Sequence, residues 1–579
     1  MNVLEVALFV FAVVGVIALG IWKSRDEELG GEKGASEYFL AGRGLTWWLV
    51  GFSLIAANIS TEQFVGMSGA SANWLGMAIA SYEWMAAITL VAVAFLFLPR
   101  FLKAGLYTIP EFLEYRYNSF ARLAMAIPMV VTLVFVATSS VIFSGAKFVS
   151  EYYNTVPILN SLTAMCWLIA IFAAVYVFIG GLKACAWTDL IWGGSLILGG
   201  AIVMFLAFST LADKPADELI LTKVANSEAT VEQLEKAGAW ERFMLLNDGA
   251  NGEAVARNGP NGSGGKVHMV RPLQDSDIPW TALLIGLWIP NFYYWGLNQF
   301  IVQRTLGSKS LAEGQRGIVF AAFLKLLIPF LVVIPGILAY NLFSQDLFNA
   351  TTGEYDYDRA FPVLVRNLVK PFPLISWFVL AALCGAVISS LASMLNSAST
   401  LATMDLYAKI THEKNPAKLV KVGRMFVVLF VILAGFVSPK LDNFESIFKY
   451  IQEFQGFISP GFIAVFLFGF FSPKTPKYFG AVGIVLNVFL YAAFKWLIGP
   501  FLVSNGLWYS DVEMAFLDRM ALCMIIILIV GLVITKLNPM KEPVEMPVTD
   551  KIDLKSSNSA KFIGVGVVVL TLILYAVFW

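Results

Sequence analysis

About fourteen stretches of this 579-residue chain are apolar over roughly the 20 residues that a membrane-spanning helix needs. Such stretches must be helical, because unpaired backbone amides and carbonyls are costly in hydrocarbon. Hydrophobic residues make up 58% of the chain and its mean hydropathy is +0.74, whereas soluble domains are usually ~45–50% apolar. The sequence therefore predicts an all-α integral membrane protein with transmembrane helices near 3–22, 46–70, 75–99, 120–146, 155–180, 185–211, 278–300, 317–343, 372–404, 422–439, 445–471, 478–501, 513–535 and 562–579.

Charge, histidine and cysteine content argue against several function classes. Lys plus Arg and Asp plus Glu both number 40, so no net positive field favours nucleic acid as a partner. Both histidines, His268 and His412, lie outside the apolar stretches, which argues against a haem held in the membrane. The cysteines are far apart, show no CxxC spacing and are interpreted as small buried residues: Cys166, Cys185, Cys384 and Cys523.

The distribution of basic residues between the apolar stretches predicts the orientation. Alternate loops carry most of the Lys and Arg residues, among them Lys23, Arg100, Arg304 and Lys418. These loops are predicted to be cytoplasmic, and an even number of spans then places both termini on the extracytoplasmic side. The first apolar stretch carries Glu5 and no preceding basic region, so it is interpreted as a span and not as a cleavable signal.

A long polar segment at 212–277 separates two groups of spans. Its Gly/Asn-rich centre, NDGANGEAVARNGPNGSGGKV, predicts an external loop with a flexible middle. The letters GSGGK resemble the end of a phosphate-binding loop. However, Pro260 stands where a glycine is expected five residues before Gly265, and Val267 follows the lysine, so no nucleotide site is predicted.

Two spans are predicted to be discontinuous, because polar and Pro/Gly residues interrupt them at a depth where irregular backbone must line a cavity. The second span contains Asn58 within SLIAANISTEQFVGMSGA, and the seventh contains Pro290, Asn291 and Gly296. The two lie five spans apart, as expected of inverted five-helix repeats around a central site. The predicted units are a first span and loop (1–45), a first repeat (46–211), an external loop (212–277), a second repeat (278–471) and peripheral C-terminal spans (472–579).

Glu83 and Lys325 each stand inside an apolar stretch. Each lies about nine residues into its span, or ~13 Å deep at ~1.5 Å per residue. That depth is near the middle of a ~30 Å hydrocarbon core. An ionised group there costs several kcal/mol, so a charge is expected to face a partner or an aqueous cavity. The two residues are interpreted either as a structural ion pair or as part of a functional site, with Tyr82 as a further donor.

Other polar residues are candidates with simpler alternatives. Ser389 and Ser390 either bond back to the preceding helical turn or, beside a broken helix with free carbonyls, bind a hard cation such as sodium. Gln452 is compatible with a helix-to-helix hydrogen bond, and Asp189 stands near a helix start, where acids are favoured in any case.

The ligand that such a set favours is neutral and rich in hydroxyls. One carboxylate, one ammonium and several amides accept from and donate to hydroxyls, and an aromatic ring covers an apolar sugar face. The ring would come from Tyr293, Tyr294 or Trp295, although these aromatics are also compatible with an interfacial belt. An amino-acid ligand stays open as an alternative.

Seven segments resemble the sodium:solute symporter family, and most closely its branch of bacterial sodium/galactose and sodium/glucose cotransporters. They are YFLAGRGLTWWLVGFSLIAANISTEQFVGMSG, IASYEWMAAIT, YTIPEFLEYRY, GGLKACAWTDLIW, NFYYWGLNQFIVQRTL, ISSLASMLNSASTLATMDLY and YIQEFQGFISPG. The resemblance runs nearly end to end, apart from the polar segment 212–277. It implies a five-plus-five inverted-repeat (LeuT-like) fold in a plasma membrane, which in a bacterium is the inner membrane. Sodium would be the coupling ion, with no other cofactor.

The resemblance also implies roles for individual residues. Five oxygen donors would hold sodium: the carbonyls of Ala56, Ile59 and Ala386 and the hydroxyls of Ser389 and Ser390. The sugar site would contain Gln63, Glu83, Asn291, Lys325 and Gln452, with Asn58 between the two sites. An inner gate would be formed by Tyr294, and an outer gate by Met67, Tyr82 and Phe448. Asp189 matches an acid on a second ion site or on the sodium path.

One departure from the family pattern concerns the ligand. Ala86 stands where close sugar-binding relatives carry Ser, so one hydroxyl contact is missing. The expected function is sodium-coupled import of a monosaccharide of the galactose/glucose type. The alternatives are a symporter for inositol, sialic acid, a nucleoside or an amino acid and, from another class, a sugar-gated sensor or channel. An enzyme is not predicted, because no set of nucleophile, base and acid is found, and the oligomeric state stays open.

Overall fold

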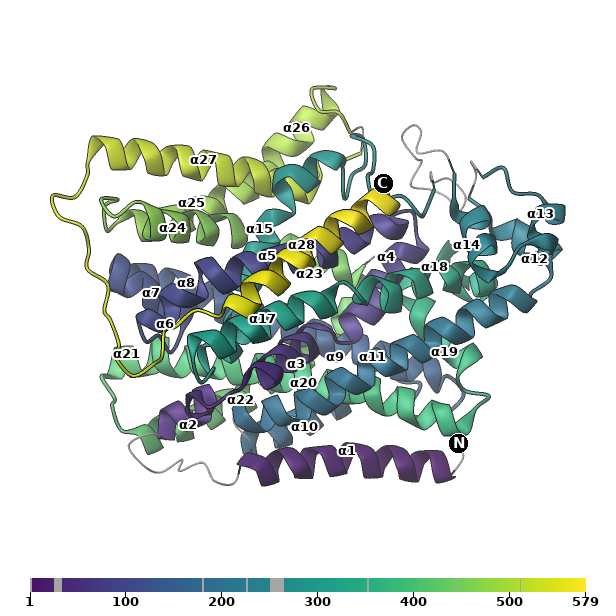
Figure 1. The fold of residues 1–579 in the computed structure, drawn as a ribbon, viewed down its shortest axis with the longest axis horizontal. Helices are drawn as coiled ribbons and strands as arrows, with labels where there is room; N and C mark the ends of the chain where they lie inside the picture. Colours follow the sequence, from purple (N-terminus) through teal and green to yellow (C-terminus); the bar gives the residue numbers. More distant parts are fainter. Residues whose placement is uncertain are drawn as a thin grey trace.

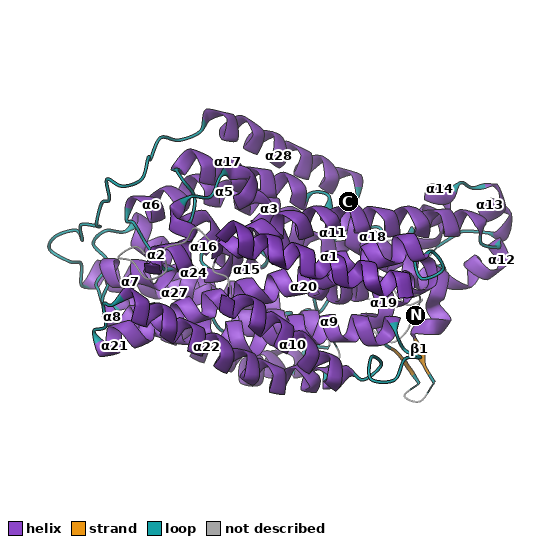
Figure 2. Ribbon diagram, turned by 90° about the horizontal axis from the view of Figure 1, so that it is seen from below, coloured by secondary structure: helices purple, strands orange, loops and turns teal. Residues whose placement is uncertain are grey.

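The computed structural model describes residues 3–24, 34–179, 182–224, 227–249, 265–350, 353–444, 446–510 and 512–579. Helices dominate these residues (Figures 1 and 2), and β1 (Phe348–Asn349) pairs with β2 (Glu354–Tyr355) in a short antiparallel hairpin. Helices before the polar segment are α1 (Val3–Ser24), α2 (Gly34–Leu40), α3 (Trp47–Asn58), α4 (Ser68–Ala72), α5 (Ser81–Leu96), α6 (Leu98–Lys103), α7 (Ile109–Arg116), α8 (Ser119–Val131), α9 (Ser139–Tyr152), α10 (Leu162–Ile179) and α11 (Leu182–Asp213). Shorter 3-10 or π turns in this part are η1 (Ala41–Arg43), η2 (Gln63–Met67), η3 (Gly76–Ala80) and η4 (Thr132–Thr138).

The polar segment and the second half are also helical. The segment holds α12 (Ala216–Leu219), η5 (Ile220–Thr222), α13 (Val231–Lys236) and α14 (Ala239–Asn247). The second half holds η6 (Ala282–Gly286), α15 (Trp288–Gly296), α16 (Gln299–Leu306), α17 (Leu311–Lys325), α18 (Ile328–Leu347), η7 (Tyr357–Arg359), α19 (Ala360–Leu368), α20 (Pro373–Leu401), η8 (Ala402–Tyr407), α21 (Ala408–Thr411), α22 (Pro416–Val437), η9 (Ser438–Asn443), α23 (Ile447–Gly456) and α24 (Ser459–Phe471). The C-terminal part holds α25 (Phe479–Ala493), η10 (Phe494–Ile498), α26 (Gly499–Ser504), α27 (Phe516–Leu537) and α28 (Asn558–Val577).

Ten helical segments in the described part of the chain are long and apolar enough to cross a membrane. The pair α23 and α24, bent by 43°, raises the number to eleven. The predicted stretches 46–70 and 155–180 carry shorter apolar helices, Trp47–Asn58 and Leu162–Val175, and 278–300 carries the short α15. The all-α membrane fold is thus confirmed, whereas the number fourteen is not reproduced by helix length, in part because two of these three stretches are broken.

Both predicted interruptions are present, but the second lies later than its proline suggests. After α3 the chain becomes extended at Ile59 (φ −92°, ψ 104°) before the helix resumes. The second break follows Gly296, where Asn298 is extended (φ −74°, ψ 121°) between α15 and α16. Pro290 lies inside α15, close to its start and shortly after the π-helical turn η6, so the proline does not mark the break.

The helices around these breaks pack closely. The first broken helix, α3, contacts α17, α11 and α16, and α20 contacts α11. Gly385 of α20 lies against Trp192 of α11, where an added Cβ would come within 2.2 Å of the indole. Small residues in α20 therefore let the two helices approach, as such residues do in membranes.

The C-terminus lies against the polar segment. The Met269 amide donates to the Phe578 carbonyl at 2.8 Å, and His268 Nδ1 lies 2.7 Å from the Trp579 carbonyl. In Figures 1 and 2 both termini lie toward the end of the bundle that carries α12, α13 and α14. This arrangement agrees with two termini on one side, although which side is extracytoplasmic stays a prediction.

The polar segment is more ordered at its ends than its composition suggests. Residues 250–264, which contain most of the predicted flexible centre, lie outside the described residues. Lys266 is buried: its ammonium donates to the Ala72 carbonyl at 2.7 Å and lies 4.0 Å from the centre of the Tyr340 ring. The lysine of the GSGGK stretch thus connects the polar segment to the helical bundle.

Candidate functional site

One cavity is lined by residues from both broken spans. Further lining residues come from α5, from the end of α17, and from α20 and α23. The cavity brings together all ten side chains predicted for ligand binding and gating: Asn58, Gln63, Met67, Tyr82, Glu83, Asn291, Tyr294, Lys325, Phe448 and Gln452.

Lys325 is at the centre of the polar contacts in this cavity. It ends α17, is fully buried, and donates to both the Glu83 carboxylate and the Asn58 side-chain oxygen. Its ammonium also lies 5.0 Å from the centre of the Trp295 ring. Glu83 and Lys325 therefore form the anticipated ion pair and line a cavity at the same time, so the two interpretations of these charges are not exclusive. Such a pair is weak evidence for stability, because desolvation offsets much of the attraction.

The aromatic side chains of α15 lie inside the protein. Tyr293 and Trp295 are only 2% and 3% exposed, which excludes the interfacial belt as their environment. The Tyr294 hydroxyl accepts a hydrogen bond from the Asn58 amide at 2.9 Å, and its ring packs edge-on against Phe300. Tyr294 is thereby connected to the end of the first half-helix.

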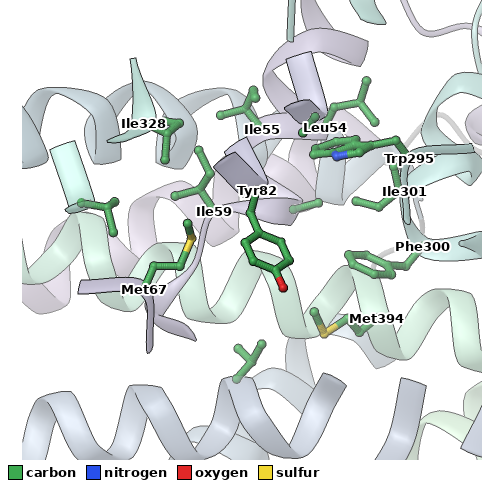
Figure 3. Close-up of a cluster of buried hydrophobic side chains, with 14 of the residues drawn as sticks. Leu54, Ile55, Ile59, Met67, Tyr82, Trp295, Phe300, Ile301, Ile328 and Met394 are labelled. Atoms are coloured by element: carbon green, nitrogen blue, oxygen red, sulfur yellow. The ribbon is translucent and has the colours of Figure 1, made fainter. Parts of the chain in front are cut away.

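A second aromatic contact covers another part of the cavity. Tyr82 and Phe448 meet edge to face with their centroids 4.9 Å apart. Figure 3 shows Tyr82 projecting between Met67 on one side and Phe300 and Met394 on the other. These side chains come from α5, η2, α16, α20 and α23, so they close the cavity only through tertiary packing.

Several polar atoms of the cavity lining have no hydrogen-bond partner among the described residues. They are Glu62 Oε2, the Tyr82 hydroxyl, Asn298 Oδ1 and Gln452 Oε1. Each such buried atom costs about 1–3 kcal/mol when it stays unpaired. A ligand with several hydroxyl groups would satisfy them.

Two of the predicted amides are partly occupied by local contacts. Gln63 Oε1 accepts from the Ser60 amide at 3.0 Å, next to the break after α3. Asn291 Nδ2 donates to the Leu287 carbonyl at 2.9 Å, within its own helix. Each side chain is thereby held at the cavity wall with its remaining amide atom still available.

Two of the predicted sodium ligands, the Ser390 hydroxyl and the Ala56 carbonyl, lie together where α3 contacts α20. The α3 carbonyls near the break have lost their partners in the next turn, and Ser390 donates to those of Ala56 (3.2 Å) and Ala57 (3.3 Å). Ser389 donates to the Asp189 carboxylate, so neither hydroxyl bonds back to its own helix. Neutral oxygens of this kind suit a hard cation.

Asp189 belongs to a buried network and not to an ordinary helix start. It lies in the second turn of α11, is fully buried, and accepts from Ser53 and Ser389 as well as from Arg304 at 3.4 Å. The helix macrodipole therefore contributes less to the stabilisation of the Asp189 carboxylate than the arginine and the two hydroxyls that contact it directly.

Arg304 is a correction to the sequence-based topology. It was assigned to a cytoplasmic loop, but it lies fully buried in α16 and donates to the Ser53 hydroxyl at 2.7 Å and to Ser393. Counting basic residues missed it, since a half-helix that follows a break can carry a loop-like sequence into the interior. Its position eight residues after Gly296 was the available signal.

Residues 38–486 match the sequence profile of the sodium:solute symporter family. The chain belongs to this family. The symporter is 36% identical to a sodium/glucose cotransporter of Vibrio parahaemolyticus, over 100% of this chain and 99% of that one. It is 32% identical to YidK, an uncharacterised symporter of Escherichia coli, over 100% of this chain and 91% of that one. The resemblance stated above is therefore confirmed.

A solved structure also shares the fold of the symporter. A Na+-coupled sialic acid symporter in a substrate-bound outward-open state superimposes with a TM-score of 0.71 at 18% identity, over 94% of this chain and 99% of that one. This likeness confirms the transporter fold around the two broken helices.

Proposed function

We propose that the protein imports a monosaccharide of the galactose/glucose type together with sodium. The single observation that carries this proposal is the cavity between the two broken helices, in which Lys325 joins Glu83 and Asn58. An ammonium, a carboxylate and several amides around an aromatic ring are suited to sugar hydroxyls. The Vibrio parahaemolyticus relative named as a sodium/glucose cotransporter supports the same ligand class.

Sodium would bind beside the sugar, at the broken end of α3. We assign it to the carbonyls of Ala56, Ile59 and Ala386 and the hydroxyls of Ser389 and Ser390, all oxygen donors as a hard cation prefers. Asp189 would serve a second ion site or the sodium path. Ala386 is fully buried on α20, one turn before Ser389 and Ser390.

Coupling would follow from the short distance along the chain between the two sites. The same four residues, Ala56 to Ile59, carry two of the three proposed sodium carbonyls and the Asn58 side chain that contacts Lys325 and Tyr294. Sodium would hold this unwound backbone in one conformation and thereby place Asn58 for the sugar. A ligand shifts a conformational equilibrium only through such a difference in affinity between states.

Transport would proceed by alternating access. Tyr294 would close the inner side of the sugar site, and Met67, Tyr82 and Phe448 would close the outer side. The two repeats, 46–211 and 278–471, would move relative to one another around the fixed site, as in transporters with broken helices at the midplane. The peripheral C-terminal spans, 472–579, would stay outside this core.

The protein would lie in a plasma membrane with both termini outside. Sodium would then enter down the membrane potential, which contributes ~2.3 kcal/mol per charge per ~100 mV. At ~1.4 kcal/mol per tenfold, one sodium ion per sugar would support roughly fifty-fold accumulation from the potential alone.

The test is uptake of radiolabelled galactose and glucose into proteoliposomes, with an inward sodium gradient against a potassium control. Sodium-dependent accumulation above equilibrium is the expected result and would also exclude a sensor or channel. If neither sugar accumulates in a folded preparation, competition by inositol, sialic acid, nucleosides and amino acids identifies the other solute. Ala86, three residues after Glu83 on α5, would then be the first position to restore to Ser.

A further inference from the structure

The first broken span brings a third ionisable residue to the sugar cavity. Among the described residues that line it, the charged types are Glu62, Glu83 and Lys325. Glu83 is paired with Lys325, whose other bond goes to the amide of Asn58. The cavity therefore holds two carboxyl groups and one ammonium, and the ammonium is already committed to Glu83.

Glu62 lines the cavity and has one carboxyl oxygen without a partner. It is only 7% exposed, and its Oε2 atom has no hydrogen-bond partner in the described part of the chain. The Ser60 hydroxyl and the Lys325 ammonium are the electrostatic neighbours of its carboxyl group. A buried carboxyl oxygen in this position is costly unless a ligand or solvent pairs with it.

The local fold explains why an acid is tolerated there. The chain is extended at Ile59, and helical backbone resumes at Thr61 and continues through η2 and α4 to Ala72. Glu62 thus lies in the first turn of the second half-helix, at the positive end of its dipole. The dipole stabilises the carboxyl group but leaves Oε2 free for contact with a ligand.

The excess acid has a consequence for ligand charge. A ligand carboxylate would meet two carboxyl groups and an ammonium that is already paired, so it is disfavoured. A hydroxyl or an amine on the ligand would instead donate to Glu62, and hydrogen bonds to charged groups are the stronger ones.

We propose that Glu62 is a further ligand-contacting residue that makes the symporter select neutral and amino sugars against sugar acids. This inference rests on the proposed sugar-symport function and defines its ligand class. It separates this chain from symporters of acidic sugars, because sialic acid carries a carboxylate.

The experiment compares sugars that differ at a single carbon. Sodium-dependent uptake of radiolabelled galactose into proteoliposomes is measured in competition with unlabelled galactose, 6-amino-6-deoxygalactose or galacturonate, for the native protein and for Glu62→Gln. The matched control is Glu232→Gln, since Glu232 is an exposed residue of α13 far from the cavity, paired with Lys236.

In the native protein we expect galactose and the amino sugar to compete for galactose uptake, and galacturonate to compete only at a much higher concentration. Glu62→Gln should lower the affinity for the amino sugar about tenfold or more relative to galactose, as expected for the loss of one hydrogen bond to a charged group. It should also reduce the difference in affinity between galactose and galacturonate by a similar factor. Glu232→Gln should change neither ratio.

The outcomes separate the two proposals. If the native protein shows no sodium-dependent uptake of galactose, the proposed sugar symport is refuted. Galactose uptake with unchanged competition ratios in Glu62→Gln would overturn only the role of Glu62, as would a native protein for which galacturonate competes as well as galactose. If Glu62→Gln fails to fold or to transport, Glu62→Asp is used instead, because it keeps the carboxyl group but moves it. Galacturonate should then still be excluded, while the affinity for the amino sugar relative to galactose should change. If this relative affinity does not change, the contact between Glu62 and the ligand is refuted.

Discussion

The amide of Asn58 donates to the hydroxyl of Tyr294 at 2.9 Å and joins the ends of the two broken helices across the cavity. The same Asn58 side chain accepts from Lys325. A side chain at the unwound end of α3 thus contacts an aromatic residue on one helix and an ammonium on another. A change at either broken helix is therefore transmitted to the other through the Asn58 side chain.

Removing the hydroxyl of Tyr294 should loosen the cavity on the proposed inner side. Tyr294→Phe keeps the ring but loses the bond to Asn58, worth about 0.5–1.5 kcal/mol. We expect faster exchange of internal for external sugar and a change in apparent affinity of no more than about tenfold. Counterflow in proteoliposomes measures this exchange. Tyr293→Phe is the matched control, because its ring packs on Phe462, and equal exchange rates in both variants would contradict the role of the hydroxyl.

Removing the hydroxyl of Ser390 should raise the sodium requirement. Ser390→Ala deletes the group that now contacts the Ala56 and Ala57 carbonyls and that would bind the ion. Loss of one ligand of this kind should raise the half-saturating sodium concentration about tenfold and leave the sugar affinity at saturating sodium nearly unchanged. The measurement is uptake against sodium concentration.

The control for this variant is Ser399→Ala, since Ser399 is a buried residue of the same helix whose hydroxyl only bonds back to Asn396 at 2.8 Å. Its sodium curve should match that of the native protein. A Ser390→Ala curve that also matches would remove Ser390 from the ion site.

Neutralising Glu83 should impair ligand affinity more than folding. Glu83→Gln removes the charge but keeps a hydrogen-bond acceptor for Lys325. Its effect on the free energy of unfolding should therefore be smaller than the about 3–5 kcal/mol that follows complete loss of one partner of a buried ion pair. We expect a rise in the apparent KM for sugar of tenfold or more, in line with about 1.5–3 kcal/mol for a hydrogen bond to a charged group. Uptake kinetics and detergent thermal stability are measured together. A purely structural ion pair would show the reverse, with lowered stability and unchanged uptake kinetics.

Lys266, which lies in the polar segment outside the predicted membrane spans, should make the stability of the protein depend on pH. Burial lowers the pKa of Lys266 to about 7 from its usual value near 10.4, so the unfolded chain binds more protons between these pH values. Stability should therefore rise with pH across this window and fall as the pH drops toward 7, with a slope from this group of up to about 1.4 kcal/mol per pH unit. Lys266→Met should flatten the curve.

The slope is obtained from the thermal midpoint of unfolding, measured in detergent at pH values between 6.5 and 9.5. This range covers the pKa of about 7 and the pH values above it where stability should rise. Lys236→Met is the control, because Lys236 is 74% exposed in the same segment and should leave the slope unchanged. If Lys266→Met and the native protein share one slope, the buried ammonium is not its source.

Much of the membrane architecture was predictable from local sequence. An apolar stretch of ~20 residues specifies a helix in a bilayer whatever surrounds it, because its backbone bonds are internal. The interruptions after Asn58 and within 278–300 were predictable for the same reason, although the second break falls after Gly296 and not at Pro290. Family motifs then indicated which residues belong together for ligand binding and gating, and the cavity contains these.

Contacts between distant residues were decided by the tertiary structure alone. Ser389 meets Asp189 across 200 positions and Lys325 meets Glu83 across 242, so no local pattern reports either partner. Arg304 resembled a loop cation until its half-helix was placed against Ser53, and Glu62 was one of several polar residues until its neighbours were known. The sequence by itself determined which segments enter the membrane and where they break, since hydrophobicity acts locally. Only the tertiary structure decided which buried charges are paired, because pairing depends on distances between helices far apart in the chain.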